Sequence, residues 1–343
     1  MKSLWEKHAV KFVGLAGAYA AWRIATGFSR QINFRNRVVV ITGGSRGLGL
    51  VLARQFASEG AKLAICARDE AELQIAQNEL LEAGIPVLAQ VCDMQDREQI
   101  RRFFATVRQD YGRIDVLVNN AGIIQVGPLS SLTHGDFENA MDTHFWGVLH
   151  AVEAGLPLMR SQGEGRIVNI ASIGGQMAVP HLLPYSASKF ALVGFSDGLR
   201  AELMKEGIYV TTVCPGLMRT GSPRNATFKG QHRAEYAWFS ISSSIPLLTM
   251  SAERAARQII SACRYGRAKI TLSIPARLAA AANALAPELI SDLMGLANWF
   301  LPQAGGIGHH AVQGKDSSSW ASPSVLTTLT DRAAQRNNEM VAE

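Results

Sequence analysis

The feature that most constrains the fold is a β-branched run that leads through a glycine-rich turn into a helix. Residues 38–41 read Val-Val-Val-Ile, the turn follows over 42–49, and residues 50–56 have helical periodicity. Its glycines, Gly43, Gly44, Gly47 and Gly49, permit a tight turn and a close backbone approach. The start of the following helix offers free N–H groups to a pyrophosphate. This unit predicts a nucleotide-binding α/β fold.

The chain continues with the same alternation of strand and helix. Apolar strands are predicted at 37–42, 61–66, 87–92, 115–119, 165–171, 208–214 and 268–273. Helices are predicted at 47–59, 69–83, 96–111, 134–160, 184–206 and 251–264. Strands that are apolar throughout indicate a parallel sheet covered on both faces, hence a doubly wound Rossmann-type fold.

A second pattern lies in the helix predicted over 184–206. Tyr185 and Lys189 stand four residues apart, so they share one helical face, and Ser172 lies thirteen residues upstream of the tyrosine. An ammonium near a phenol favours the phenolate and makes tyrosine a proton donor or acceptor near neutral pH. Taken alone, a tyrosine and a lysine at this spacing also fit an ordinary helix surface.

Taken together, these patterns resemble the short-chain dehydrogenase/reductase family. The turn reads Thr-Gly-x-x-x-Gly-x-Gly over 42–49, Asn-Asn-Ala-Gly follows the fourth predicted strand at 119–122, and Pro215 to Thr220 match a Pro-Gly-x-x-x-Thr stretch. Ser172, Tyr185 and Lys189 have the family's catalytic spacing. Order and separations agree over about residues 36 to 273. The resemblance implies hydride transfer between a nicotinamide and a carbonyl or alcohol carbon.

The resemblance also implies a role for each residue. Tyr185 passes the proton, Ser172 binds the reacting oxygen, and Lys189 lowers the tyrosine pKa and binds the nicotinamide ribose. Thr220, with the backbone after Pro215 and Gly216, fixes the carboxamide. The full set of expected cofactor-binding residues is Thr42, Gly43, Ser45, Arg46, Gly47, Leu48, Gly49, Arg68, Asp93, Asn120, Ala121, Gly122, Tyr185, Lys189, Pro215, Gly216 and Thr220.

The charges near the second and third strands favour NADP(H). NAD enzymes of this architecture carry an acid at the end of the second strand, where this chain has Ala67 and Arg68. Arg68 and Arg46 can bind a 2′-phosphate, unless Asp69 neutralises Arg68. Asp93, after the third strand, either approaches the adenine, as in the family, or caps the next helix.

One position departs from the family pattern. His144 stands in Thr-His-Phe-Trp-Gly, where the family has a catalytic asparagine whose main-chain carbonyl holds a water and whose side chain steadies a helix distortion. A histidine keeps that carbonyl and supplies its own donor or acceptor. An active enzyme is therefore expected. The alternative is a catalytically impaired nucleotide-binding, redox-sensing or scaffold protein of the same fold.

Composition limits the other classes of function. The chain has 343 residues, 48% of them hydrophobic, and a formal charge of +6. Its basic residues are scattered, which argues against nucleic-acid binding. Cys66, Cys92, Cys214 and Cys263 lack metal-ligand spacing, so we expect buried thiols in a reducing compartment and propose no metal site. Residues 217–250, rich in large apolar side chains, are expected to form a substrate lid over a fairly apolar alcohol or carbonyl compound.

The termini lie outside the resemblance. An amphipathic helix is predicted over 1–31, the catalytic domain over 32–275, an apolar helical extension over 276–302 and a polar, flexible tail over 303–343. The helix either lies in a membrane interface or packs on the protein itself or a subunit partner. Its apolar stripe comprises Trp5, His8, Phe12, Leu15, Tyr19 and Trp22. A signal peptide is disfavoured because NADP(H) chemistry needs the cytosolic cofactor pool, so we expect a cytoplasmic protein, peripheral on a membrane if the helix binds lipid. The family resemblance implies a homodimer or homotetramer.

Overall fold

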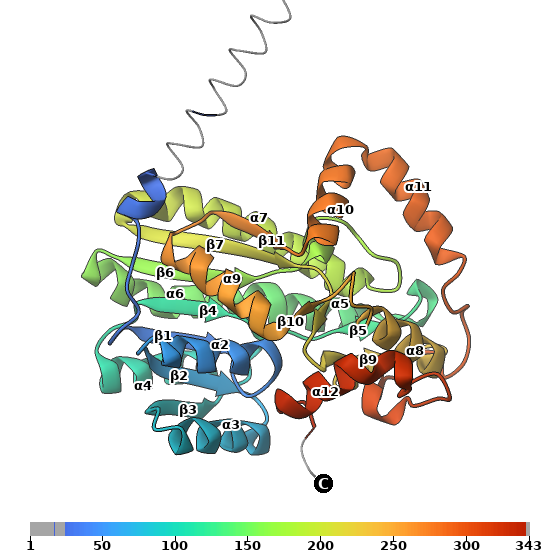
Figure 1. Ribbon diagram of the computed structural model, residues 1–343, viewed down its shortest axis with the longest axis horizontal. Helices are drawn as coiled ribbons and strands as arrows, with labels where there is room; N and C mark the ends of the chain where they lie inside the picture. The colour runs from blue at the N-terminus through green and yellow to red at the C-terminus, as the bar shows by residue number, and fades with distance from the viewer. Residues whose placement is uncertain (1–16, 18–24, 341–343) are drawn as a thin grey trace, which may run out of the picture.

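A seven-stranded parallel sheet forms the centre of the computed structural model, which describes residue 17 and residues 25–340 (Figure 1). The strand order is β11-β7-β6-β4-β1-β2-β3, and every neighbouring pair is parallel. The strands are β1 (Val38–Thr42), β2 (Lys62–Ala67), β3 (Val87–Val91), β4 (Val116–Asn119), β6 (Gly165–Ile170), β7 (Ile208–Pro215) and β11 (Lys269–Leu272). The order reverses direction between β1 and β4, where ligands bind in open α/β sheets.

Helices cover both faces of this sheet because alternate strand residues point to opposite sides. α2 (Gly47–Ser58), α3 (Glu70–Glu82) and α9 (Ala252–Arg264) pack on the face that includes Val39 and Ile41. α4 (Arg97–Tyr111), α6 (Gly147–Gln162) and α7 (Leu183–Leu203) pack on the face that includes Val38 and Val40. The predicted doubly wound Rossmann-type fold is thereby confirmed.

The helix predicted over 134–160 is interrupted. It consists of α5 (His134–Met141), a π-helical turn at Asp142–Trp146, and α6. After this turn the helix passes against the loop that follows β3, where a Cβ on Gly147 would overlap the carbonyl oxygen of Met94. The wider turn buries Thr143 and His144. The helix distortion that the family resemblance implied is present at His144.

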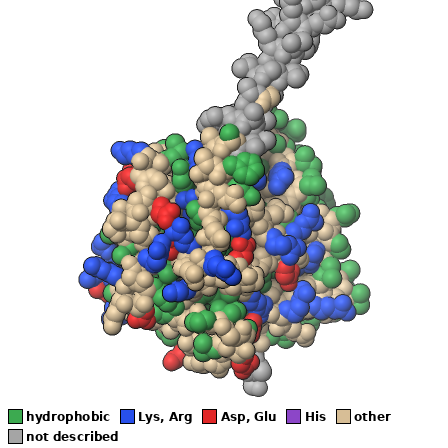
Figure 2. Space-filling view, turned by 60° about the vertical axis from the view of Figure 1, so that its left-hand side comes forward, with side chains coloured by type: hydrophobic (Ala, Val, Ile, Leu, Met, Phe, Trp, Pro, Cys, Tyr) green, Lys and Arg blue, Asp and Glu red, His purple; other side chains and the backbone are tan. Residues whose placement is uncertain are grey.

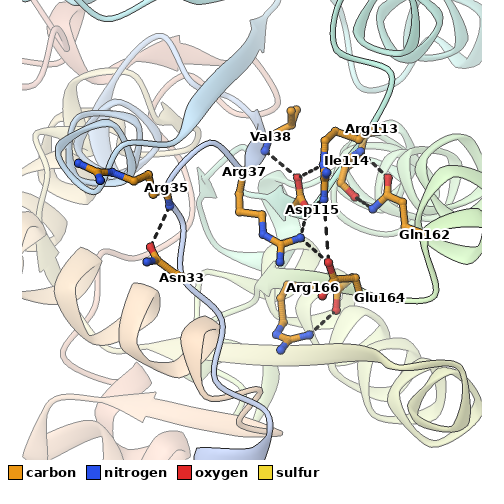
Figure 3. Close-up of polar contacts among 11 residues, drawn as sticks. Asn33, Arg35, Arg37, Val38, Arg113, Ile114, Asp115, Gln162, Glu164 and Arg166 are labelled. Atoms are coloured by element: carbon orange, nitrogen blue, oxygen red, sulfur yellow. Dashed lines mark hydrogen bonds and ion pairs between the residues drawn. The ribbon is translucent and has the colours of Figure 1, made fainter.

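The amino ends of the strands are held by a cluster of charges around Asp115 (Figure 3). Its carboxylate accepts from Arg37 Nη1 at 2.6 Å, Arg113 Nη2 at 2.5 Å and the Val38 backbone N–H at 2.8 Å. Burial acts to raise the pKa of Asp115, but these donors outweigh it and hold the pKa below its ordinary value. The charge cluster thus supports the sheet at the amino ends of its strands, opposite their carboxyl ends.

Residues 217–250 contain more regular structure than predicted. They include β8 (Met218–Arg219), β9 (Thr227–Phe228), α8 (His232–Ser242) and the first residue of β10 (Met250–Ser251). β9 pairs with β5 (Gln125–Val126) on one side and β12 (Val312–Gln313) on the other. Phe228, Tyr236 and Phe239 form a small apolar core with the neighbouring loops. The role of this segment as a lid stays a prediction.

Beyond β11, the predicted helical extension is present as α10 (Ile274–Leu285) and α11 (Pro287–Asn298), which project from the domain (Figure 1). The following residues differ from the flexible tail that the sequence predicted. They include β12 and α12 (Thr328–Arg336), and Ala333 and Ala334 are fully buried. The buried side chains of α12 are small, so the polar composition of this segment did not indicate that it packs on the domain.

The stripe from Trp5 to Trp22 lies outside the described residues. Among the residues described, no helix is long and apolar enough to cross a membrane. On the face drawn in Figure 2, Lys and Arg side chains are scattered among hydrophobic and other residues. All four cysteines are buried, as expected.

Candidate active site

A cleft of about 1500 Å³ lies at the carboxyl ends of the strands. It brings together nearly all the site residues that the sequence singled out. Those lining it are Gly43, Ser45, Arg46, Gly47, Leu48, Arg68, Asp93, Asn120, Ala121, Gly122, His144, Ser172, Tyr185, Lys189, Pro215, Gly216 and Thr220. Thr42 and Gly49 are buried behind this lining.

The glycine-rich loop is held by hydrogen bonds from the chain after β4. Thr42 Oγ1 accepts from the backbone N–H groups of Asn120 and Ala121 at 3.0 and 3.1 Å. The Asn120 amide donates to the Thr42 and Gly43 carbonyls at 3.1 and 2.9 Å. A Cβ on Gly49 would overlap the Gly43 carbonyl oxygen, so α2 can begin this close to the loop only with glycine there. Thr42 and Gly49 therefore shape the loop from behind the cleft.

Ser172, Tyr185 and Lys189 converge at the inner end of the cleft. Ser172 follows β6 and its Oγ accepts from the Gly174 N–H at 3.0 Å, while Tyr185 and Lys189 lie in the first two turns of α7. Lys189 Nζ donates to the Ile170 carbonyl at 2.9 Å and lies 5.7 Å from the centre of the Tyr185 ring. The predicted juxtaposition of the three side chains is present.

The electrostatics of this group differ from the expectation. Burial raises the pKa of Tyr185 above its ordinary value, against an opposing hydrogen bond with Ser172. Burial also lowers the pKa of Lys189 to about 7, so its positive charge is itself disfavoured in the cleft. The expected lowering of the tyrosine pKa by Lys189 is thus not seen, because desolvation dominates both groups.

His144 is fully buried on the π-helical turn. Its Nε2 accepts from the Ile123 N–H at 3.1 Å, so in the neutral ring the proton lies on Nδ1, which donates to Ser188 Oγ at 2.7 Å. Ser188 in turn donates to the Tyr185 carbonyl at 2.9 Å. Burial and the nearby Lys189 charge lower the pKa of His144 well below its ordinary value, which keeps the ring neutral. This chain of bonds joins the turn to the helix of Tyr185.

Arg68, Asp69 and Asp93, the residues on which the expected choice of NADP(H) and the adenine contact depend, differ in the hydrogen bonds that they make in the structure. Arg68 is exposed at the cleft, and no ion pair or hydrogen bond of its side chain is found among residues 25–340. Asp69 instead caps α3 by accepting from the Glu72 N–H at 2.9 Å. Asp93 also lines the cleft, whereas α4 is capped by Asp96. The alternatives that Asp69 neutralises Arg68 and that Asp93 caps α4 therefore do not hold.

Three polar residues near the cleft were not predicted: Glu72, Ser188 and Glu339. Arg46 pairs with Glu72, and its Nε lies 3.5 Å from Glu339 Oε2. Glu339 accepts from Asn225 Nδ2 at 2.6 Å and lines the cleft. Ser188 lies within the Tyr-Ser-Ala-Ser-Lys stretch, but nothing in the sequence indicated that its side chain has a role. Glu339 lay in the tail assigned no structure, so nothing in the sequence connected it with the loop.

Comparison with known proteins decides the family. Residues 37–229 match the family described as short chain dehydrogenase. The chain belongs to the short-chain dehydrogenase family. A relative of this family, the putative oxidoreductase SadH of Mycobacterium tuberculosis, is 32% identical over 276 residues, which cover 80% of this chain and 96% of the relative.

Solved structures of family members agree with the fold. A variant of the actinorhodin polyketide ketoreductase with NADPH has a TM-score of 0.62 at 32% identity, covering 69% of this chain and 96% of its own. A short chain dehydrogenase/reductase from Burkholderia phymatum in complex with NAD has a TM-score of 0.69 at 27% identity, covering 75% of this chain and 96% of its own. The protein is thus a nucleotide-binding oxidoreductase of the short-chain dehydrogenase family.

Proposed function

We propose that this protein is an NADP(H)-dependent oxidoreductase that interconverts a carbonyl and an alcohol on a fairly apolar small molecule. The observation that carries the proposal is the convergence of Ser172, Tyr185 and Lys189 in one cleft with the glycine-rich loop. Membership in the short-chain dehydrogenase family supports the reaction class.

The residues of the cleft fit a nicotinamide dinucleotide. Gly43 adopts φ +64°, and a Cβ there would lie 2.8 Å from the Ala121 Cα, so only glycine lets the loop pack this closely on the chain after β4. The start of α2 and Arg46 would hold phosphate, Asp93 the adenine, and Lys189 the ribose next to the nicotinamide. When bound, the cofactor supplies or accepts the hydride.

The chain's own residues would move and hold the proton. In the reductive direction the Tyr185 hydroxyl donates its proton to the substrate oxygen, and in the oxidative direction the phenolate takes it back. Ser172 Oγ donates a hydrogen bond to the same oxygen and stabilises the developing negative charge. His144, held by Ile123 and Ser188, would keep the π-helical turn beside this group in place.

Two observations support NADP(H) over NAD(H). The end of β2 carries Ala67 and Arg68 in place of an acid, and Arg68 stands exposed at the cleft and unpaired among the described residues. A guanidinium can bind a 2′-phosphate through two parallel hydrogen bonds. Structures of relatives contain either cofactor, NADPH in the actinorhodin ketoreductase and NAD in the Burkholderia protein. The preference for NADP(H) is therefore inferred from the positive charge of Arg68 and not from these relatives.

An apolar substrate is supported by the apolar side chains that line the cleft near Tyr185. Val179, Leu182, Trp238 and Phe239 line it together with the catalytic group. These residues would exclude water and bind a hydrocarbon surface while Ser172 and Tyr185 hold the single reacting oxygen. The match to a polyketide ketoreductase agrees with a carbonyl substrate of this kind.

The proposal is tested by following NADPH and NADH oxidation against a panel of ketones, aldehydes, steroids and quinones. We expect turnover with at least one apolar carbonyl compound and a clear preference for NADPH. Tight NADPH binding with no turnover on any member of the panel would favour the alternative, a nucleotide-binding protein that has lost catalysis. Preference for NADH would contradict the assignment of Arg68.

We also propose a cytoplasmic homodimer or homotetramer with peripheral membrane contact through residues 1–31, whose aromatic stripe is flanked by Lys7, Lys11 and Arg23. An apolar contact is also supported by Leu285 at the end of α10 and by Trp299 and Phe300 directly after α11, which are 80% or more exposed. The full chain should co-sediment with anionic liposomes at low salt and be partly released at high salt. A chain lacking residues 1–28 should stay in the supernatant but keep its NADPH affinity. Equal sedimentation of both chains would contradict the role of the stripe.

A further inference from the structure

The last described residues, Asn337–Met340, lie directly on the glycine-rich loop, and we call them the C-terminal strap. The Gly47 N–H, at the first residue of α2, donates to the Asn337 carbonyl at 2.8 Å. The Asn338 amide donates to the Ser45 carbonyl at 3.0 Å and to the Glu72 carbonyl at the same distance. The strap therefore occupies the Gly47 N–H, which belongs to the loop that we propose binds a cofactor phosphate.

The strap also reaches the opposite side of the cleft. The Asn337 amide donates to the Thr220 carbonyl at 3.4 Å, and Asn225 Nδ2 donates to the Glu339 backbone carbonyl at 3.1 Å. Thr220 and Asn225 follow β7, on the side where the family resemblance places the nicotinamide contacts. Glu339 and Met340 line the cleft between the two sides. The strap is thus fixed across the cofactor position by several bonds rather than by one.

The Glu339 carboxylate has the surroundings of a bound anion. It lies beside Arg46 and accepts from Asn225, and Oε1 is 2.6 Å from the position that a Cβ on Gly47 would take. It therefore touches the loop backbone at the start of α2, where the helix N-terminus favours negative charge. A guanidinium and a helix N-terminus are also the groups that bind a phosphate.

We propose that the C-terminal strap is an autoinhibitory contact in which Glu339 competes with a dinucleotide phosphate for Arg46 and the glycine-rich loop. The inference rests on the proposed NADP(H) function. Two anions cannot share this loop without repulsion, so the cofactor binds only when the strap moves away or Glu339 loses its charge. The strap lowers the affinity for the cofactor in the resting protein.

The charges that face Glu339 give the competition a pH dependence. They are Arg46 from the loop, Arg224 from the segment after β8, and Glu72 from α3. Burial raises the pKa of Glu339 to about 7, with Arg46 opposing this shift and Glu72 adding to it. Below that pH the carboxyl is neutral and the repulsion is absent. The inhibition should therefore be present above about pH 7 and weaken as the pH falls.

The test compares NADPH dissociation constants by calorimetry for four chains: the full chain, Glu339→Gln, a deletion of residues 337–343, and Glu288→Gln. Glu288 is exposed on α11, away from the cleft, and serves as the charge-matched control. We expect Glu339→Gln and the deletion to bind NADPH roughly two- to fivefold more tightly, the size of an ion pair with one partly exposed partner. The control should equal the full chain.

The pH series distinguishes competition from a structural role. The ratio of the dissociation constants of the full chain and Glu339→Gln should grow between about pH 6 and about pH 8. If Glu339→Gln binds NADPH as tightly as the full chain or more weakly, the autoinhibitory role of the strap is overturned while the proposed function stays intact. Failure of every chain to bind NADPH or NADH would overturn both. Circular dichroism verifies folding, and Glu339→Gln decides the question if the deletion does not fold.

Discussion

Replacing His144 tests how the site is supported where the chain departs from its family. In His144→Leu the Ile123 N–H loses its acceptor and Ser188 Oγ loses a donor. An unpaired buried N–H costs about 1–3 kcal/mol, and a lost neutral hydrogen bond costs about 1 kcal/mol. Leucine has nearly the volume of histidine, so little cavity is left. We expect His144→Leu to reduce the free energy of unfolding by roughly 2–4 kcal/mol and to lose activity as the π-helical turn shifts.

His144→Asn is the matched control. The shorter amide can still bond to Ser188 and keeps the backbone carbonyl of the turn, but it leaves the Ile123 N–H unpaired, so we expect a loss of about 1–3 kcal/mol with activity retained. Urea unfolding followed by fluorescence, with NADPH oxidation on the same samples, gives both quantities. His144→Leu within about 0.5 kcal/mol of the unchanged protein and fully active would refute this account.

The lowered pKa of His144 adds a second readout. In the unfolded chain the ring titrates near 6.5, whereas in the folded protein it stays neutral. Below about pH 6.5 the unfolded state therefore binds an extra proton, and the unchanged protein loses stability that His144→Asn does not lose. The free energy of unfolding of the unchanged protein, relative to that of His144→Asn, should therefore fall by about 1.4 kcal/mol between about pH 8 and roughly pH 5.5. A difference that is independent of pH would mean that His144 has the same pKa in the folded protein as in the unfolded chain.

Two further predictions follow from the charged groups of the cleft. Arg68→Ala should weaken NADPH roughly tenfold and hardly affect NADH, measured as dissociation constants; equal losses for both would make Arg68 structural. Lys189 has a folded pKa of about 7, below its unfolded value of 10.5, so the unfolded state binds the extra proton between these values and stability rises with pH. Lys189→Met should reduce that slope by roughly 1 kcal/mol per pH unit near pH 8 in unfolding experiments, and an unchanged slope would contradict the burial of the charge.

Much of the fold could be predicted because its signals are local. The apolar residues of β1 and the glycines after it lie next to one another in the sequence, and parallel pairing of β1 with β2 and β4 brings the carboxyl ends of these strands together. Ser172, Tyr185 and Lys189 could be placed in one cleft for the same reason. Their order and spacing specify the site once the sheet is formed.

The remaining features depend on burial and on contacts between distant segments. The pKa of Lys189 is set by how much water the folded cleft excludes, which no spacing in the sequence reveals. The contact between Gly47 and Asn337 joins residues nearly three hundred positions apart, through a helix whose buried residues are small alanines. The buried side chains of this helix are too small for the sequence to indicate which surface they contact.

The central claim is that Tyr185 carries the proton, and a single substitution tests it. Tyr185→Phe removes the hydroxyl and keeps the ring, the glycine-rich loop and Lys189. Single-turnover NADPH oxidation with the best carbonyl substrate, together with NADPH binding by calorimetry, should show turnover reduced by roughly a hundredfold or more with the affinity for NADPH unchanged. Near-normal turnover in Tyr185→Phe would contradict the proposed mechanism.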